Sequence, residues 1–62
     1  MSRFVAITND GGKRVAIPII AINRIEEDDY STLIETDTGY HKTREDVDSI
    51  IERINETVKA PA

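Results

Sequence analysis

The clearest pattern of apolar and polar positions lies in the last third of the chain, where apolar residues recur every three or four positions. This is the period of an amphipathic helix. Thr43 precedes the pattern as a candidate N-cap, with Asp46 three residues later in the place of a capping-box acid, and the spacing predicts a helix over residues 44–59. Glu45 and Arg53 are among the polar positions expected to face water. The apolar stripe consists of Val47, Ile50, Ile51, Ile54 and Val58.

The first two thirds of the chain are typical of short strands separated by turns. Residues 9–12 (Asn-Asp-Gly-Gly) favour a hairpin turn, because Asn, Asp and Gly tolerate a positive φ. Pro18 has no N–H to donate to a ladder, so residues 18–21 are predicted to form either a short helical turn or a strand crossover. The predicted strands span residues 3–8, 13–17, 22–27, 32–36 and 40–42.

Together these elements predict an α+β fold: an antiparallel β-meander of four to five short strands followed by one C-terminal amphipathic helix. With 62 residues the chain has room for a single domain, made of a β-sheet over 3–42 and a helix over 44–59. Apolar residues of the sheet and the helix are expected to form one core. The expected core residues are Phe4, Val15, Ile17, Ile25, Leu33, Val47, Ile50, Ile51 and Ile54.

Apolar residues on both faces of the first strand change this picture. Phe4 and Ala6 point to one side of an extended strand, and Val5 and Ile7 point to the other. A single helix covers only one face of a sheet. A domain this small is marginally stable by itself and usually adds disulfides, a metal or a second subunit. Because the chain has no cysteine, a homo-oligomer is the predicted reinforcement.

Composition argues against several classes of function. A formal net charge of −4 and a pI near 4.7 disfavour binding to nucleic acid, which needs a basic face. No apolar run approaches the roughly 20 residues of a membrane span, and the N-terminus has no apolar leader. No membrane insertion and a cytoplasmic location are therefore expected. With one histidine and no cysteine, neither a metal site nor a cofactor is predicted.

Three local features resemble functional motifs but favour plain structural roles. The acidic run 26–29 is predicted to be a solvated turn, since consecutive extended residues point to alternate sides and cannot all ligate a hard cation. Gly11 and Gly12 stand outside any phosphate-binding motif and are expected to form a hairpin turn. His41 is the only imidazole, and no Ser-His-Asp spacing surrounds it. The chain is therefore predicted not to be an enzyme.

One segment is chemically distinct, because it gathers cations and an aromatic ring in an acidic chain. It lies where the predicted helix begins, and free backbone N–H groups at a helix start can bind an anion. The segment is thus a candidate site for an anion or a protein partner. The alternative is that Lys42 and Arg44 form ion pairs with Glu45, Asp46 or the acidic run 26–29. The candidate residues are Tyr40, His41, Lys42, Thr43 and Arg44, with Lys13 and Arg14 as further contributors.

Four features occur together along the chain: the Asn-Asp-Gly-Gly turn at 9–12, the segment Ile-Asn-Arg-Ile-Glu-Glu at 22–27, the turn Thr38-Gly39, and Thr-Arg-Glu-Asp-Val at 43–47 before an Ile-rich helix. In this layout the chain resembles the small FlbD-like flagellar proteins of bacterial motility operons. The resemblance covers nearly the whole chain. It implies a small non-enzymatic accessory protein with no catalytic residues.

Two functions of different classes follow from these patterns. The first is a non-enzymatic, homo-oligomeric interaction module that binds a protein partner, which by resemblance is a motility accessory protein. The second is an oligomeric small-molecule binder that holds a nucleotide or another small anionic ligand at subunit interfaces, through segment 40–44. A third, an acidic mimic that blocks a nucleic-acid-binding protein, needs a regular array of charge, for which a net charge of −4 is low.

Overall fold

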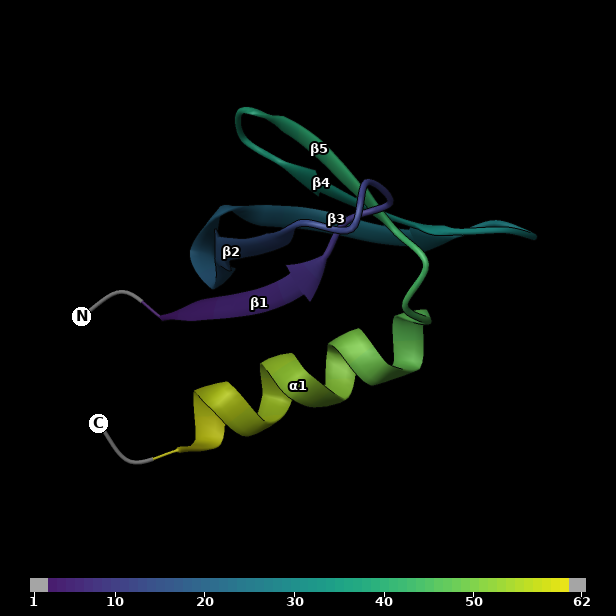
Figure 1. The fold of residues 1–62 in the computed structure, drawn as a ribbon. Coiled ribbons are helices and arrows are strands. Elements are labelled where there is room, and N and C mark those ends of the chain that lie inside the picture. Colours follow the sequence, from purple (N-terminus) through teal and green to yellow (C-terminus); the bar gives the residue numbers. More distant parts are fainter. Residues whose placement is uncertain (1–2, 61–62) are drawn as a thin grey trace.

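The structure is a computed structural model that describes residues 3–60. Within this range five strands come first and one helix follows (Figure 1), which confirms the α+β fold class. No helix in the same range is long and apolar enough to cross a membrane. In chain order the elements are β1 (Phe4–Thr8), β2 (Arg14–Pro18), the 3₁₀ helix η1 (Ile19–Ala21), β3 (Ile22–Glu27), β4 (Thr32–Thr36), β5 (Gly39–Thr43) and α1 (Val47–Lys59).

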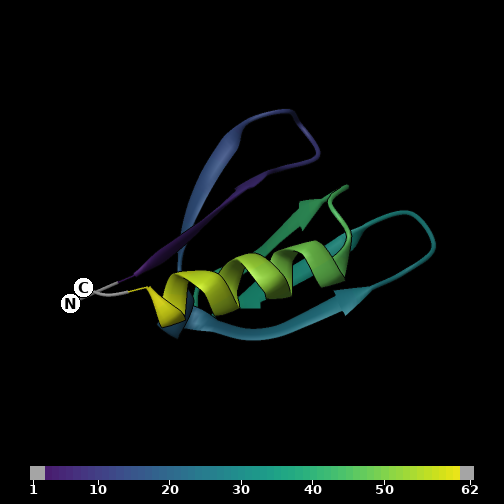
Figure 2. The same cartoon turned by 90° about the horizontal axis from the view of Figure 1, so that it is seen from below.

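The strands form two antiparallel sheets that meet at one corner. β1 pairs with β2 in one sheet, and β4 lies between β3 and β5 in the other. The sheets meet at an isolated bridge between Asn9 and Thr43 and at a 2.9 Å bond from the Asp10 amide to the Lys42 carbonyl. The strands therefore follow one another in the order β2-β1-β5-β4-β3. The helix α1 lies across one side of them, with β2 and β3 at the outer margins (Figure 2).

Two predictions about turns are confirmed. In the β1–β2 turn the Asn9 side chain accepts hydrogen bonds from the Gly11 and Lys13 amides at 3.0 and 2.9 Å. Gly12 has a φ of 84°, a value that costs little only for a residue without a Cβ. Pro18 ends β2, and the next three residues form the helical turn η1, which was one of the two alternatives for this segment.

The core lies between the inner faces of the strands and the apolar side of α1. Strand alternation selects it: Val5 and Ile7 face inward from β1, so Phe4 faces outward. The prediction of Phe4 as a core residue is therefore wrong, and its side chain is 52% exposed. The fully buried apolar residues are Val5, Ile7, Ile17, Ile34 and Ile50.

The other predicted core residues divide into three groups. Ile17 and Ile50 are confirmed as buried. Ile51 is 43% exposed, so its assignment to the core is wrong: its neighbour Ile50 takes the inward position, and adjacent helical residues point about 100° apart. The half-buried residues are Val15, Ile25, Leu33, Val47 and Ile54.

The helix α1 begins three residues later than predicted. Its N-cap is Asp46, whose carboxylate accepts from the Ser49 amide (3.3 Å) and hydroxyl (2.7 Å). Thr43, the predicted N-cap, belongs to β5, and its buried hydroxyl donates to the Thr8 carbonyl (2.6 Å). Pairing with β1 thus draws Thr43 into the sheet and leaves Asp46 to cap the helix. At the other end, Arg3 donates to three carbonyls at the helix C-terminus.

Candidate functional site

The turn from β5 into α1 is held by Glu45, which bonds through all of its polar groups. Its amide donates to the Thr43 hydroxyl (3.2 Å), and its carbonyl accepts from the Thr32 hydroxyl (2.7 Å). Its carboxylate accepts from the Thr8 amide (2.9 Å) and from the Arg53 guanidinium (2.6 Å). The prediction that Glu45 and Arg53 face water is therefore wrong, because the fold places both beside backbone groups that need partners.

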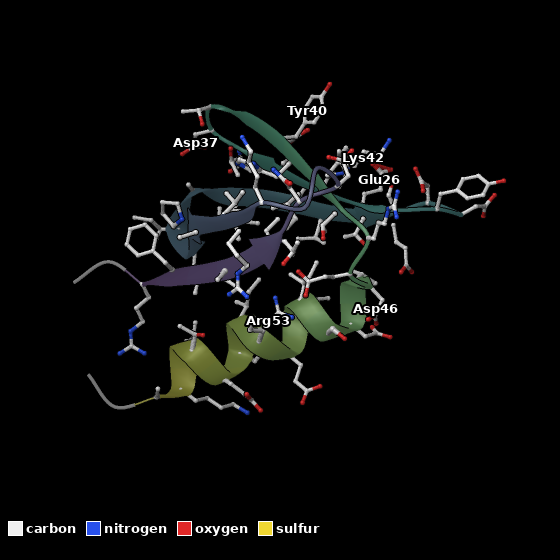
Figure 3. All side chains as sticks on the ribbon, in the orientation of Figure 1. Glu26, Asp37, Tyr40, Lys42, Asp46 and Arg53 are labelled. Atoms are coloured by element: carbon white, nitrogen blue, oxygen red, sulfur yellow. The ribbon has the colours of Figure 1, made fainter. Side chains whose placement is uncertain are left out.

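Glu45 and Arg53 stabilise each other's charged form. Arg53 also donates to the Ala6 carbonyl (2.7 Å), and Figure 3 shows it on α1, on the side that faces the strands. The hydrogen bond from Arg53, followed by that from the Thr8 amide, lowers the pKa of the Glu45 carboxyl, and the Glu45 carboxylate raises the pKa of Arg53. Together the two side chains fix the direction in which the chain leaves β5.

Alternation along β5 divides the candidate segment between two faces. Thr43 is fully buried and His41 is half-buried on the inner face. Tyr40 and Lys42 point to the opposite face, away from α1 (Figure 3). Arg44 follows β5 in an exposed turn. The structure therefore brings only part of the predicted site onto one surface.

Tyr40 and Lys42 belong to an open surface of mixed charge. Leu33 lies opposite Lys42 in the register, with Glu26 on the other side of Leu33. These four side chains, with Asp28, line a hollow of about 390 Å³, and Tyr40 is 70% exposed. We call this surface the outer face; it comprises Arg24, Glu26, Leu33, Glu35, Tyr40 and Lys42.

Arg44 lines three further hollows, and two of them also include Asp10 of the β1–β2 turn. One of about 250 Å³ is lined by Lys42, Arg44, Asp10 and Asp28. The other, of about 380 Å³, lies where Arg44 meets the β1–β2 turn, and Glu45 lines it as well. In the part of the chain that the structure describes, neither Lys42 nor Arg44 belongs to an ion pair. Carboxylates nevertheless line each of these hollows, so the two cations lie in an acidic setting.

Three of the first four amides of α1, those of Val47, Ser49 and Ile50, already have a partner. The Ser49 amide donates to the Asp46 carboxylate, and the hydrogen bonds from Ser49 lower the pKa of Asp46. The Val47 amide donates to the Glu27 carboxylate (3.4 Å). The Ile50 amide donates to the Asp46 carbonyl (3.3 Å). Most of the N–H donors at this helix start therefore have partners within the fold, which disfavours an anion there.

Lys13 and Arg14 lie apart from the outer face, in the β1–β2 hairpin, and both are exposed. Arg14 is close enough to Glu45 to lower the pKa of that carboxyl, after the larger effects of Arg53 and Thr8. Neither Lys13 nor Arg14 lines any of the hollows described above. The structure therefore does not join these two cations to Tyr40 and Lys42.

The acidic run 26–29 leads into a turn, as predicted. The Asp28 carboxylate accepts from the Tyr30 and Ser31 amides, both at 2.8 Å, and these bonds lower its pKa. The Asp28 amide in turn donates to the Ser31 carbonyl (2.9 Å). Among residues 3–60, no group of three or more His, Cys, Asp or Glu side chains is placed to hold a metal ion.

Leu33 was not expected beside Lys42, whereas Glu26 and Asp28 belong to the acidic run that was considered as its ion-pair partner. Leu33 had been assigned to the core because it is apolar. Strand alternation is the signal that could have corrected this: with Ile34 facing inward, Leu33 must face outward. The place of Glu26 beside Leu33 depends on the pairing of β3 with β4, which no local pattern reveals.

The function of the chain has to be inferred from this geometry. No family model, no curated protein and no solved structure matches the chain. The resemblance to the FlbD-like flagellar proteins stays a prediction.

Proposed function

We propose that the chain is a small non-enzymatic interaction module whose outer face binds a protein partner. The observation that carries this proposal is the setting of Leu33: this apolar side chain and the exposed Tyr40 ring lie among charges of both signs, beside a hollow of about 390 Å³. Aromatic anchors surrounded by polar groups are typical of protein interfaces. A fitting partner presents an apolar side chain to the hollow, a base toward Glu26 and an acid toward Lys42.

The same charges argue against a small free anion as the ligand. Lys42 and Arg44 are the cations at the end of β5, but Asp10, Asp28 and Glu45 line the hollows that these cations border. A phosphate bound there would meet like charges at short range, which raises its free energy. A protein partner avoids this cost, because it can present separate groups to each charge.

The position of the only imidazole supports a non-enzymatic role. His41 lies on the inner face of β5, turned away from the hollow beside Tyr40 and Lys42. A general base must come within hydrogen-bond reach of the proton that it removes, and His41 does not meet this condition for a ligand on the outer face. By the FlbD-like resemblance, such a module is expected to be a motility accessory protein.

Selection from a library of random short peptides displayed on phage tests this proposal. We expect the wild-type chain to enrich peptides that carry an apolar residue flanked by charges of both signs. Lys42→Glu should replace the preference for an acid on one flank by a preference for a base. Glu52→Lys, on the exposed side of α1, is the matched control and should leave the selected pattern unchanged. Absence of enrichment, or an unchanged pattern with Lys42→Glu, would contradict the proposal.

Calorimetric titration with inorganic phosphate and with ATP separates this function from the small-anion alternative. We expect neither compound to bind, because carboxylates line the hollows around Lys42 and Arg44. Saturable binding that Arg44→Ala abolishes would instead identify an anion site at the end of β5. The protein-partner proposal would then have to be withdrawn.

A further inference from the structure

The outer edge of β2 carries backbone groups that have no partner in the fold. At one end of the β1–β2 ladder, the Ile19 amide donates to the Arg3 carbonyl (2.9 Å). Hydrogen-bonded and non-hydrogen-bonded pairs alternate along an antiparallel ladder. In this register Val15 and Ile17 therefore bond to β1, and Ala16 turns its N–H and C=O away from it.

Two residues of β2 share this outward orientation. Arg14 and Ala16 each present an N–H and a C=O. Pro18 has no N–H, and as the N-cap residue of η1 it gives its C=O to the first bond of that helix. No other backbone group in the described part of the chain bonds to the outward groups of Arg14 and Ala16. Figure 2 shows β2 at one margin of the molecule, with no element beyond it. The edge is therefore open at Arg14 and Ala16 and ends at Pro18.

The other edges of the fold are either covered or poorly suited to a further strand. On the far side of β1, where β5 diverges, Arg53 donates to the Ala6 carbonyl (2.7 Å). Next to it, Glu45 accepts from the Thr8 amide (2.9 Å). The other marginal strand, β3, has a register shift near its start and ends in two acids. Bulges, charges and proline oppose strand addition. β2 has no register shift, and its one charge, Arg14, and its proline, Pro18, lie at its two ends, so these devices leave Ala16 in the middle of the edge open.

Apolar side chains flank the open edge. Phe4, the cross-strand neighbour of Pro18, is 52% exposed, and Ile20 is 84% exposed. Ala16 is exposed in the middle of the strand, and Val15 is half-buried at the margin of the core. Unpaired backbone with apolar flanks is a template for another strand. The occupant of this edge is therefore an extended segment.

We propose that a second copy of this chain occupies the edge, with the two β2 strands antiparallel across a twofold axis and Ala16 opposite the partner's Ala16. The two Ala16 residues then exchange both of their hydrogen bonds. The Pro18 carbonyl is engaged by η1, so the outward N–H and C=O of Arg14 keep water as their partner at the exposed start of the strand. The dimer is isologous. It does not use the outer face, so it stands independently of the proposed function.

The charges of β2 favour this register and this occupant. Arg14 lies opposite the partner's Pro18, so the two Arg14 residues are four positions apart, about 13 Å along the strand. That separation exceeds the screening length of roughly 8–10 Å. Each guanidinium comes beside the partner's Phe4 instead, where a cation over an aromatic face is favourable. A register with Arg14 opposite the partner's Ala16 would bring the two cations into diagonal contact.

Sedimentation equilibrium tests the dimer. The wild type is expected at twice the monomer mass of 7.0 kDa. Ala16→Glu and Ala16→Lys each place like charges about 5.5 Å apart at the backbone and should weaken dimerisation about tenfold or more, whereas an equimolar mixture of the two should restore it. Thr38→Glu, in the exposed β4–β5 turn, should leave the dimer intact. A wild type that is monomeric at high micromolar concentration, or a mixture no more dimeric than either variant, would overturn the proposal.

Oxidative cross-linking provides a second test that does not depend on charge. The chain has no cysteine, so Ala16→Cys introduces the only thiol. A Cα separation of about 5.5 Å across the axis lies within the roughly 4.4–6.8 Å that a disulfide spans, and we expect most of the oxidised protein to be a covalent dimer. Asn55→Cys, exposed on α1, should remain mainly monomeric. Equal cross-linking of both variants, or none at position 16, would also refute the dimer.

Discussion

The Arg53 guanidinium lies 2.6 Å from the Glu45 carboxylate, and each side chain also bonds to the backbone of β1. The pair takes the place of a neighbouring strand where β5 turns away from β1. Glu45 supplies an acceptor for the Thr8 amide, and Arg53 supplies a donor for the Ala6 carbonyl. The two side chains are only 28% and 38% exposed, so their bonds are partly sheltered from competition by water.

Arg53→Ala is expected to lower the free energy of unfolding by about 1–3 kcal/mol, because it leaves the Ala6 carbonyl and the Glu45 carboxylate without their donor. Arg24→Ala is the matched control. Its ion pair with Glu26 is 62% and 54% exposed, and exposed pairs contribute about 0–1 kcal/mol. Urea unfolding followed by circular dichroism measures both variants. If both variants lose the same free energy of unfolding, the bonds from Arg53 to β1 and Glu45 stabilise the fold no more than an ordinary surface ion pair does.

Acid is expected to destabilise the fold partly through Glu45. Arg53, then the Thr8 amide, lowers the pKa of Glu45 below its ordinary value of 4.5. The ionised carboxylate therefore stabilises the fold fully above that pH, and its contribution is lost as the pH falls through the lower pKa of the folded state. Glu45→Gln should show a smaller decrease in urea midpoint than the wild type between about pH 5 and pH 2. Asp28 and Asp46, whose pKa values are also lowered, are present in both chains, so identical pH profiles would exclude a role for Glu45.

The buried hydroxyl of Thr43 is expected to stabilise the fold through its hydrogen bonds, beyond the packing of the side chain. It donates to the Thr8 carbonyl and accepts from the Glu45 amide, in a side chain that is 0% exposed. Thr43→Val keeps the volume but leaves both backbone groups without that partner, so we expect a loss of about 1–3 kcal/mol. Thr38→Val, in the exposed turn, should change stability by less than about 0.5 kcal/mol. Thermal unfolding of the two variants decides between these outcomes, and a Thr43→Val chain as stable as the wild type would contradict the expectation.

Two neighbouring isoleucines of α1 are expected to differ strongly in their contribution to the free energy of unfolding. Ile50 is 0% exposed and Ile51 is 43% exposed. Ile50→Ala should lower the free energy of unfolding by about 2–5 kcal/mol, because it opens a cavity in the core between the strands and α1. Ile51→Ala should cost less than about 1 kcal/mol, since much of its surface is already in water. Similar losses in urea unfolding would mean that the helix packs in another rotation.

The order and type of the elements could be predicted from the sequence, because their causes are local. The apolar period that contains Ile50 and Ile54 depends on residues within one or two helical turns. The turn with Gly12 depends on four consecutive residues, and the end of the ladder at Pro18 depends on the missing N–H. Each of these features constrains the backbone whatever the rest of the chain does.

The candidate surface could be predicted only in part. The charge and the aromatic ring of segment 40–44 identified Tyr40 and Lys42, and strand alternation placed them on one face. Their neighbours Glu26 and Leu33 come from other strands, and the register that brings them together is set by long-range pairing. The same pairing turned His41 and Thr43 inward.

Only the tertiary structure decided which face of β1 is buried and where α1 begins. Both faces of β1 carry apolar residues, and the side on which the helix packs selected Val5 over Phe4. Thr43 and Asp46 are both good capping residues, but the Thr8 carbonyl takes the Thr43 hydroxyl, so Asp46 caps the helix. These choices depend on burial and on hydrogen-bonding groups from distant parts of the chain, and those partners come within reach only when the chain folds.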